Sequence, residues 1–164
     1  LKRLLQLPRI KKRKKTRIMN DLILFTKKYE VSTFDGFLIT DEAIINDNKL
    51  IPIKALWDTG SSESVISNNL ANKLNLCSIG SALLNGTSLS CKTNIYEVVL
   101  LLAKKQQIIL HVTGSPQIGD NNIDLLIGLD VISMCDFVIS TDNKNLCMSV
   151  RFPSQGLIDF TKDC

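Results

Sequence analysis

The sequence lacks the features that would place it in several common classes of protein. It has no uninterrupted apolar run near the ~18 residues that a membrane-spanning helix needs, so we expect no membrane span. The basic N-terminus is not followed by an apolar segment and a small-residue cleavage site, so we expect no secretory signal. The five cysteines are widely spaced and contain no CxxC pair. This pattern disfavours a zinc site and favours free thiols in a reducing cytoplasm.

Histidine is almost absent as well. His111 is the only histidine and lies in an apolar, strand-like context, which is typical of a structural residue. No GxSxG motif occurs, so a serine triad has little support. Gly114 and Gly119 have the spacing of a phosphate-binding loop, but Asp120 and Asn121 replace the lysine and the hydroxyl residue that such a loop needs. No cluster of carboxylates and histidines suggests a metal, and we expect no cofactor.

The net charge of +4 hides a strongly basic N-terminus. Residues 1–18 contain nine Lys or Arg and no acid, which leaves 11 basic against 16 acidic residues in the rest of the chain. We expect residues 1–18 to be a disordered arm or an extension outside the fold, with nonspecific nucleic-acid contact as the functional alternative. The composition changes at Met19, so one domain is expected at residues 19–155, followed by a C-terminal tail at residues 156–164.

The domain itself is a succession of short apolar runs separated by polar turns. Strands are expected at residues 22–25, 37–39, 43–45, 50–57, 79–84, 93–103, 108–112, 124–128, 137–140 and 146–152. Ser67 is placed to cap one short helix, and Asp130 is placed to cap another that begins near Val131. Many short strands with few helical periods predict an all-β domain, closed or sandwiched, with one or two short helices.

The rest of the chain is organised around the stretch from Ala55 to Ser67. A buried strand is expected to end at Trp57, and Asp58-Thr59-Gly60 then turns the chain before a second apolar pair. A carboxylate between two apolar segments is costly unless its hydrogen bonds are satisfied or its charge is used. Gly60 is expected to let the backbone turn tightly. Asp58 is therefore the leading candidate for chemistry.

An Asp-Thr-Gly tripeptide alone is more often a local Asx turn than a catalytic site. A second apolar run, from Leu126 to Gly128, makes the catalytic interpretation stronger. A strand that passes beneath the Asp58 turn would need a small residue where the two segments cross, and Gly128 supplies one.

Two motifs carry a resemblance to a known family. Residues 55–62 resemble the active-site motif of aspartic proteases, and residues 126–130 resemble the apolar-apolar-Gly motif of the retroviral-type, single-lobe members. Residues 136–154 also resemble bacterial retropepsin-like proteins. The resemblance covers about residues 20–155 and implies a single-lobe acid-protease (retropepsin-like) closed β-barrel or sandwich.

The resemblance also assigns roles around the turn. Asp58 would be the catalytic acid and base. Thr59 would form cross-subunit hydrogen bonds, and Gly60 would allow close approach of the backbone. Ser61 would donate a hydrogen bond to the outer oxygen of Asp58.

Further roles concern the surroundings of the turn. Ile127 and Gly128 would support the active-site loop from below. The turn that covers the substrate would be the tip of a flap hairpin, formed by Asn85, Gly86 and Thr87.

Peptide hydrolysis by this route needs two carboxylates that share one proton, one to activate water and one to polarise the carbonyl. The chain has one Asp-Thr-Gly and no Asp-Ser-Gly. Asp124 and Asp130 lie near the second motif, but each is expected to be a cap or a surface acid. We therefore expect a C2 homodimer in which the partner supplies the second Asp58, acting on polypeptide substrates at acidic to near-neutral pH.

Two departures from the family pattern motivate an alternative. Trp57 is much bulkier than the small aliphatic residue usual before the aspartate, and Cys135 stands where the bacterial relatives usually have glycine. Because small misplacements in such a site cost orders of magnitude in rate, the alternative is a peptide-binding or dimerisation module that keeps the fold and cleaves nothing.

Overall fold

The computed structural model describes residues 22–85, 90–119 and 122–162. The basic arm at residues 1–18 and the flap residues Gly86 and Thr87 lie outside these ranges. Within them the chain forms mostly strands, with two short α-helices and one 3-10 helix. In chain order these elements are β1 (Ile23–Glu30), β2 (Leu38–Asn46), β3 (Lys49–Trp57), β4 (Val65–Ser67), α1 (Asn68–Lys73), β5 (Ser78–Asn85), β6 (Ser90–Leu102), β7 (Gln106–Ser115), β8 (Leu125–Ile127), α2 (Leu129–Ile132), β9 (Asp136–Thr141), β10 (Asn145–Phe152) and η1 (Phe160–Lys162).

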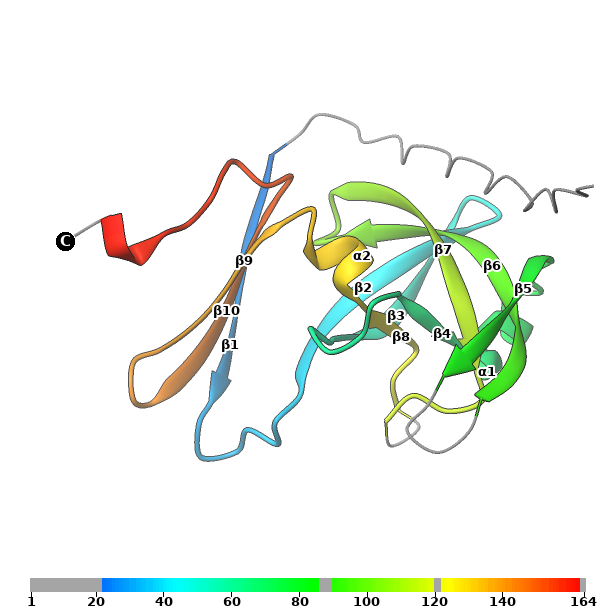
Figure 1. Ribbon diagram of the computed structural model, residues 1–164, viewed down its shortest axis with the longest axis horizontal. Coiled ribbons are helices and arrows are strands. Elements are labelled where there is room, and N and C mark those ends of the chain that lie inside the picture. The colour runs from blue at the N-terminus through cyan, green and yellow to red at the C-terminus, as the bar shows by residue number, and fades with distance from the viewer. Residues whose placement is uncertain (1–21, 86–89, 120–121, 163–164) are drawn as a thin grey trace, which may run out of the picture.

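The strands form a closed barrel and a smaller, separate sheet (Figure 1). The larger sheet has the order β2-β3-β8-β4-β7-β6-β5, and an additional pairing between β2 and β6 closes six of its strands into the barrel. β5 pairs with β6 outside the closed ring. The smaller sheet has the order β1-β10-β9 and is antiparallel throughout. The predicted all-β class with a closed barrel and one or two short helices is confirmed.

The two sheets share one hydrophobic core. A single cluster of buried side chains joins the barrel interior to Met148, Val150 and Phe152 of β10. At the junction, Trp57 at the end of β3 is tilted against Phe25 of β1 and stacked on Phe137 of β9, with ring centroids 6.0 and 5.6 Å away. The small sheet is therefore packed on the end of the strand that leads to Asp58.

Most of the predicted strands are present, but two of them are merged. Residues 37–39 and 43–45 were expected to be separate strands, whereas β2 runs continuously from Leu38 to Asn46. Of the polar residues between them, Thr40 and Glu42 are buried and hydrogen-bonded, while Asp41 is exposed on the opposite face of the strand. Thr40 accepts a hydrogen bond from the Trp57 indole at 2.9 Å, and Glu42 accepts one from the Ala103 amide at 2.7 Å.

The helices begin for different reasons. Ser67 caps α1 as predicted, because its hydroxyl accepts a hydrogen bond from the Leu70 amide. The predicted cap of the second helix was wrong: α2 begins after Gly128, and Asp130 lies inside its first turn. Asp130 is used instead as a partner for a buried hydroxyl described below. None of the helices in the described part of the chain is long and apolar enough to cross a membrane.

Candidate active site

Asp58 directly follows β3 and is held at its backbone by a neighbouring strand. Its amide donates to the carbonyl oxygen of Ile127 at 3.0 Å. Its Oδ1 accepts a hydrogen bond from the Gly60 amide at 2.8 Å, the local geometry of an Asx turn. No described residue donates to Oδ2, and the side chain is half-buried. One carboxylate oxygen thus accepts a hydrogen bond within the loop, while the other has no donor among the described residues.

Gly60 lies at a close approach between its own backbone and the Asp58 side chain. Its φ is not in the left-handed region, so the turn does not need glycine for its conformation. A Cβ at this position would lie 3.1 Å from Asp58 Oδ1, which is tighter than an ordinary contact. Glycine therefore lets the Asp58 carboxylate approach the Gly60 backbone closely enough to accept its N–H.

The hydroxyl of Ser61 points away from Asp58. The Ser61 amide donates to the Asp58 carbonyl oxygen at 3.3 Å, but its Oγ donates to the Glu63 carbonyl oxygen at 2.8 Å. The expected hydrogen bond from Ser61 to the outer oxygen of Asp58 is absent from the described contacts, because this single hydroxyl proton is used within the loop.

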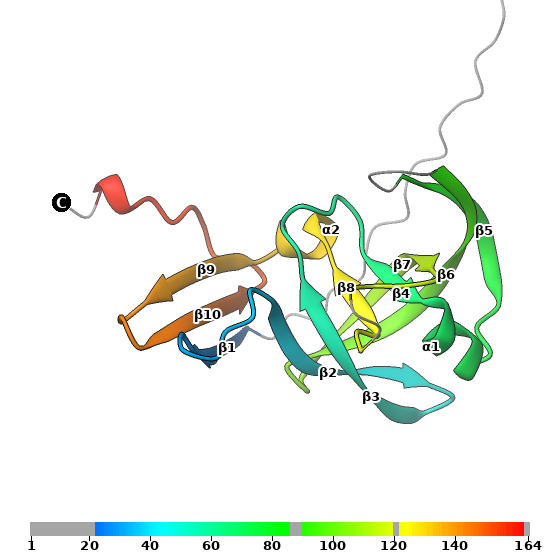
Figure 2. The ribbon, with the colours of Figure 1, turned by 90° about the horizontal axis from the view of Figure 1, so that it is seen from below.

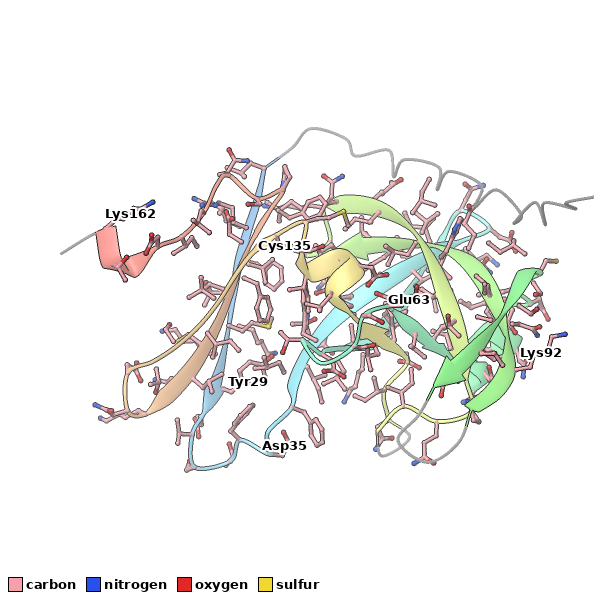
Figure 3. All side chains as sticks on the ribbon, viewed as in Figure 1. Tyr29, Asp35, Glu63, Lys92, Cys135 and Lys162 are labelled. Carbon is pink, nitrogen blue, oxygen red and sulfur yellow. The ribbon has the colours of Figure 1, made fainter. Side chains whose placement is uncertain are left out.

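β8 passes beneath the Asp58 loop, between the two strands that flank it. It pairs in parallel with β3 and antiparallel with β4, so Ile127 lies opposite Trp57. A Cβ on Gly128 would lie 2.7 Å from both the carbonyl carbon and oxygen of Glu63. Figure 3 shows Glu63 on this loop, beside α2. Only glycine fits where the two backbones cross.

Ser64 adds hydrogen bonds at the point where the two segments cross. It was not identified as a site residue from the sequence. It is fully buried, and its Oγ accepts from the Gly128 amide at 3.1 Å and donates to Asp130 Oδ1 at 2.8 Å. The Leu129 amide also donates to the Ser61 carbonyl oxygen at 2.8 Å. The loop after Asp58 is thus bonded at both ends to the Gly128 segment. Only the position of Ser64 just before an apolar pair could have suggested its burial.

The fold as a whole is similar to that of a solved structure. The structure matches the crystal structure of a retropepsin-like aspartic protease from Rickettsia conorii with a TM-score of 0.52 and 16% sequence identity, over 80% of this chain and 96% of that chain. The chain has a retropepsin-like fold. The EIAV protease complexed with the inhibitor HBY-793 matches with a TM-score of 0.49 and 18% identity, over 62% of this chain and 89% of that one.

A third match is the retroviral protease-like domain of Ddi1 from Leishmania major, with a TM-score of 0.41 and 19% identity, over 74% of this chain and 98% of that domain. The sequence itself matches no protein-family model and no curated protein. The match to the Rickettsia conorii protein, at 16% sequence identity, supports a shared fold and nothing more specific.

Trp57 packs where the barrel meets the small sheet of this retropepsin-like fold. The indole is almost fully buried, stacks on Phe137 and donates its N–H to Thr40. The indole contacts Thr40, Phe25 and Phe137, and none of these described contacts involves Asp58. The large side chain of Trp57 is accommodated where the end of β3 packs on the small sheet.

The predicted flap corresponds to the hairpin of β5 and β6. Asn85 ends β5 and lies opposite Ser90 at the start of β6. Gly86 and Thr87, the predicted tip, lie outside the described residues. Thr59 is exposed at the Asp58 loop. The structure thus gives the positions of Thr59 and Asn85 and does not test their predicted roles.

The remaining candidates do not form a second site. His111 is an exposed β7 residue whose Nε2 lies 3.0 Å from Glu97 on β6. Cys135 follows α2, where burial, then the nearby Asp136, raises the pKa of its thiol to about 12. The described cysteines Cys77, Cys135 and Cys147 are free. No group of three or more histidine, cysteine or acidic side chains that could hold a metal occurs within residues 22–85, 90–119 and 122–162.

Proposed function

We propose that this chain is an aspartic endopeptidase that hydrolyses peptide bonds through a water molecule activated by Asp58 and the Asp58 of a second subunit. The observation that carries the proposal is the Asp58 loop itself. Gly60 donates to one carboxylate oxygen, the other oxygen has no donor among the described residues, and the backbone is supported by Ile127 and Gly128 within a retropepsin-like fold.

The chemistry needs the two carboxylates in different protonation states. The ionised one accepts a proton from the water, which attacks the carbonyl carbon of the scissile bond. The protonated one donates its proton to the carbonyl oxygen, giving a tetrahedral diol. One carboxyl group then protonates the leaving amine nitrogen as the C–N bond breaks, and one hydroxyl of the diol gives its proton to the other, ionised carboxylate as the C=O bond re-forms. The products are a carboxylic acid and an amine, and the pair again shares one proton.

A homodimer follows from this chemistry because each chain brings one such loop. A C2 axis through the site places two identical loops face to face. Thr59 lies on the exposed side of the loop, where it can reach its counterpart. The hairpin of β5 and β6, with Asn85, Gly86 and Thr87, would cover an extended polypeptide substrate.

The test is cleavage of an unstructured protein by the wild type and by the Asp58→Asn variant, at high protein concentration and from acidic to neutral pH. Asparagine keeps the size of the side chain and its acceptor for the Gly60 amide, so the fold should be retained while cleavage is lost. Cleavage by Asp58→Asn at the wild-type rate would contradict the proposal. Binding of an extended peptide by a folded dimer without turnover would favour a non-catalytic binding module.

A further inference from the structure

A buried glutamate on β2 takes no part in the mechanism proposed above. The side chain of Glu42 is only 4% exposed, and it forms no ion pair with any described residue. Burial raises the pKa of its carboxyl above 4.5, so it titrates in the acidic to near-neutral range expected for the reaction. Glutamate is rarely buried without an ion-pair partner, and a buried acid of this kind is a candidate for a functional role.

Hydrogen bonds connect Glu42 to Trp57. Glu42 and Thr40 are two residues apart on β2, so their side chains share one face of the strand. The Thr40 hydroxyl donates to the Glu42 carboxylate, and its oxygen accepts the N–H of the Trp57 indole at 2.9 Å. Figure 2 shows β2 and β3, the strands that carry these three residues, side by side. A continuous chain of side-chain hydrogen bonds therefore runs from Glu42 to the end of β3.

The other end of this chain is the turn between β6 and β7. The Ala103 amide donates to Glu42 Oε2 at 2.7 Å. Ala103 and Lys104 form the turn, with φ angles of 49° and 58°. The pairing of β2 with β6 lies close by, since Ala43 is opposite Leu101. Glu42 is thus held in place by the backbone where the barrel closes, which leaves its second oxygen for Thr40.

The protonation state of Glu42 decides the direction of the hydrogen bonds. A carboxylate only accepts, so it takes the single hydroxyl proton of Thr40 and leaves the Thr40 oxygen to accept the indole N–H. Protonated Glu42 has a donor of its own. When it donates to Thr40, the indole shares that oxygen and the Thr40 proton loses its acceptor. Because buried hydrogen bonds in a chain strengthen one another, Trp57 is held more firmly when Glu42 is ionised.

We propose that Glu42 is a positioning residue for Asp58, which ionised Glu42 holds in place through Thr40 and Trp57. The inference rests on the proposed function, in which Asp58 is the catalytic group. Trp57 is the last residue of β3 and Asp58 follows it directly, so the indole fixes the point where the loop leaves the strand. Asp58 is not among the charged groups that shift the pKa of Glu42, so the coupling passes through side-chain contacts.

Two other charged groups act on Glu42. Asp41, its neighbour on the exposed face of β2, raises the pKa of Glu42, and Lys104 in the β6–β7 turn lowers it. The residue opposite Glu42 on β3 is Ile53, which is apolar. Removal of the Asp41 charge should therefore lower the pKa of Glu42 without breaking the chain of hydrogen bonds. Asp41 and Glu42 thus form a matched pair of acids on one strand.

The first test follows the indole N–H of Trp57 by proton–nitrogen NMR as a function of pH. Trp57 is the only tryptophan, so it gives a single indole resonance. Every protein in this test carries Asp58→Asn, which removes the titration of the adjacent acid and any self-cleavage. The indole proton should move downfield as pH rises, with a midpoint above 4.5. Addition of Glu42→Gln should hold it near its low-pH position, because glutamine, like the protonated acid, both donates and accepts.

Three further variants control this test. Asp41→Asn removes a neighbouring carboxylate, so the titration should persist with a lower midpoint. Thr40→Val removes the hydroxyl between Glu42 and Trp57 and should abolish the response. Thr40→Ser keeps that hydroxyl and should restore it. An indole resonance that titrates alike with and without Glu42 would overturn the inference.

Cleavage by chains that keep Asp58 gives the second test. Glu42 acts on the Asp58 segment and not on the substrate, so Glu42→Gln should lower kcat and leave KM nearly unchanged. Since small misplacements cost up to about a hundredfold in rate, we expect kcat to fall by about threefold to tenfold at neutral pH. Below about pH 4.5 the loss should be small, because Glu42 of the wild type is then protonated as well. Asp41→Asn should keep the wild-type kcat at neutral pH.

The inference and the proposed function fail on different results. Equal kcat values for Glu42→Gln and the wild type at neutral pH, or a ratio that stays constant with pH, would overturn the role of Glu42 and leave Asp58-dependent cleavage standing. Absence of Asp58-dependent cleavage from every variant and the wild type would contradict the proposed function. The indole titration needs no activity, so it decides in either case whether Glu42 acts on Trp57.

Discussion

The indole of Trp57 is stacked on the ring of Phe137, with the ring centroids 5.6 Å apart and the planes 24° apart. This contact joins the strand that ends at Asp58 to the edge strand of the other sheet. Trp57 is the only tryptophan of the chain, so its fluorescence reports on this junction alone.

Replacement of Phe137 should loosen the junction. An aromatic pair contributes about 0.5–1.5 kcal/mol beyond its buried area, so Phe137→Leu should lower the free energy of unfolding by about that amount. The emission of Trp57 should shift to longer wavelength. Phe34→Leu is the control, because Phe34 packs on Tyr29 and not on Trp57. An equal emission shift in both variants would contradict this account of the junction.

The crossing at Gly128 should tolerate no side chain. Gly128→Ala would place a Cβ 2.7 Å from the Glu63 backbone, so we expect a loss of about 1–3 kcal/mol in the free energy of unfolding together with a loss of cleavage. Gly80→Ala serves as the stability control, because its Cβ would meet Ile95 at an ordinary 3.8 Å. Urea unfolding compares the two. Equal stability of Gly128→Ala and the wild type would show that the loop does not rest on Gly128.

The Ser64 hydroxyl should be needed for stability. Ser64→Ala leaves the Gly128 amide without its acceptor and removes a donor from Asp130, at a cost of about 1–3 kcal/mol. The exposed Ser62 provides the matched variant Ser62→Ala, which should stay within about 0.5 kcal/mol of the wild type. Chemical denaturation of both variants measures this difference. If Ser64→Ala is as stable as Ser62→Ala, these hydrogen bonds do not hold the loop.

Glu42 should make the stability depend on pH. Burial raises the pKa of its carboxyl above 4.5, although the Ala103 amide and the Thr40 hydroxyl oppose the shift. A raised pKa in the folded state means that its contribution is fully present below the unfolded value and is lost as pH rises through the folded value. Glu42→Gln should therefore gain thermal stability relative to the wild type as pH rises above about 4.5. A constant difference in melting temperature from pH 4 to 7 would contradict this.

The sequence was sufficient for the fold class, for the strands that end just before Asp58 and Gly128, and for the cap at Ser67, because these depend on local apolar patterns and short motifs. It was insufficient where distant segments meet. Ser64 and Asp130 lie 66 positions apart, and no local pattern links a serine to an aspartate at that distance. From the sequence, the bulk of Trp57 suggested a disturbed active site. The folded chain shows instead that its ring packs against Phe137 and Phe25.

At Gly60 the resemblance implied a close approach of the backbone, but the sequence could not say which atom approaches it. Glycine is usually explained by a positive φ, but here it makes room for the Asp58 carboxylate. The pocket lined by residues 135–139 and by Ser154, Gly156, Leu157 and Ile158 is formed by segments that lie before and after the β9–β10 hairpin, so it too required the folded chain.

The central claim is that two chains each supply one Asp58 to a single site. The most direct measurement mixes wild type with Asp58→Asn, exchanges the subunits, and follows cleavage at constant total protein. Random pairing at equal amounts leaves about one quarter of the dimers with two intact carboxylates, so the account predicts about one quarter of the wild-type rate. A rate near one half, proportional to the wild-type chain, would show that each subunit works alone and would contradict the account.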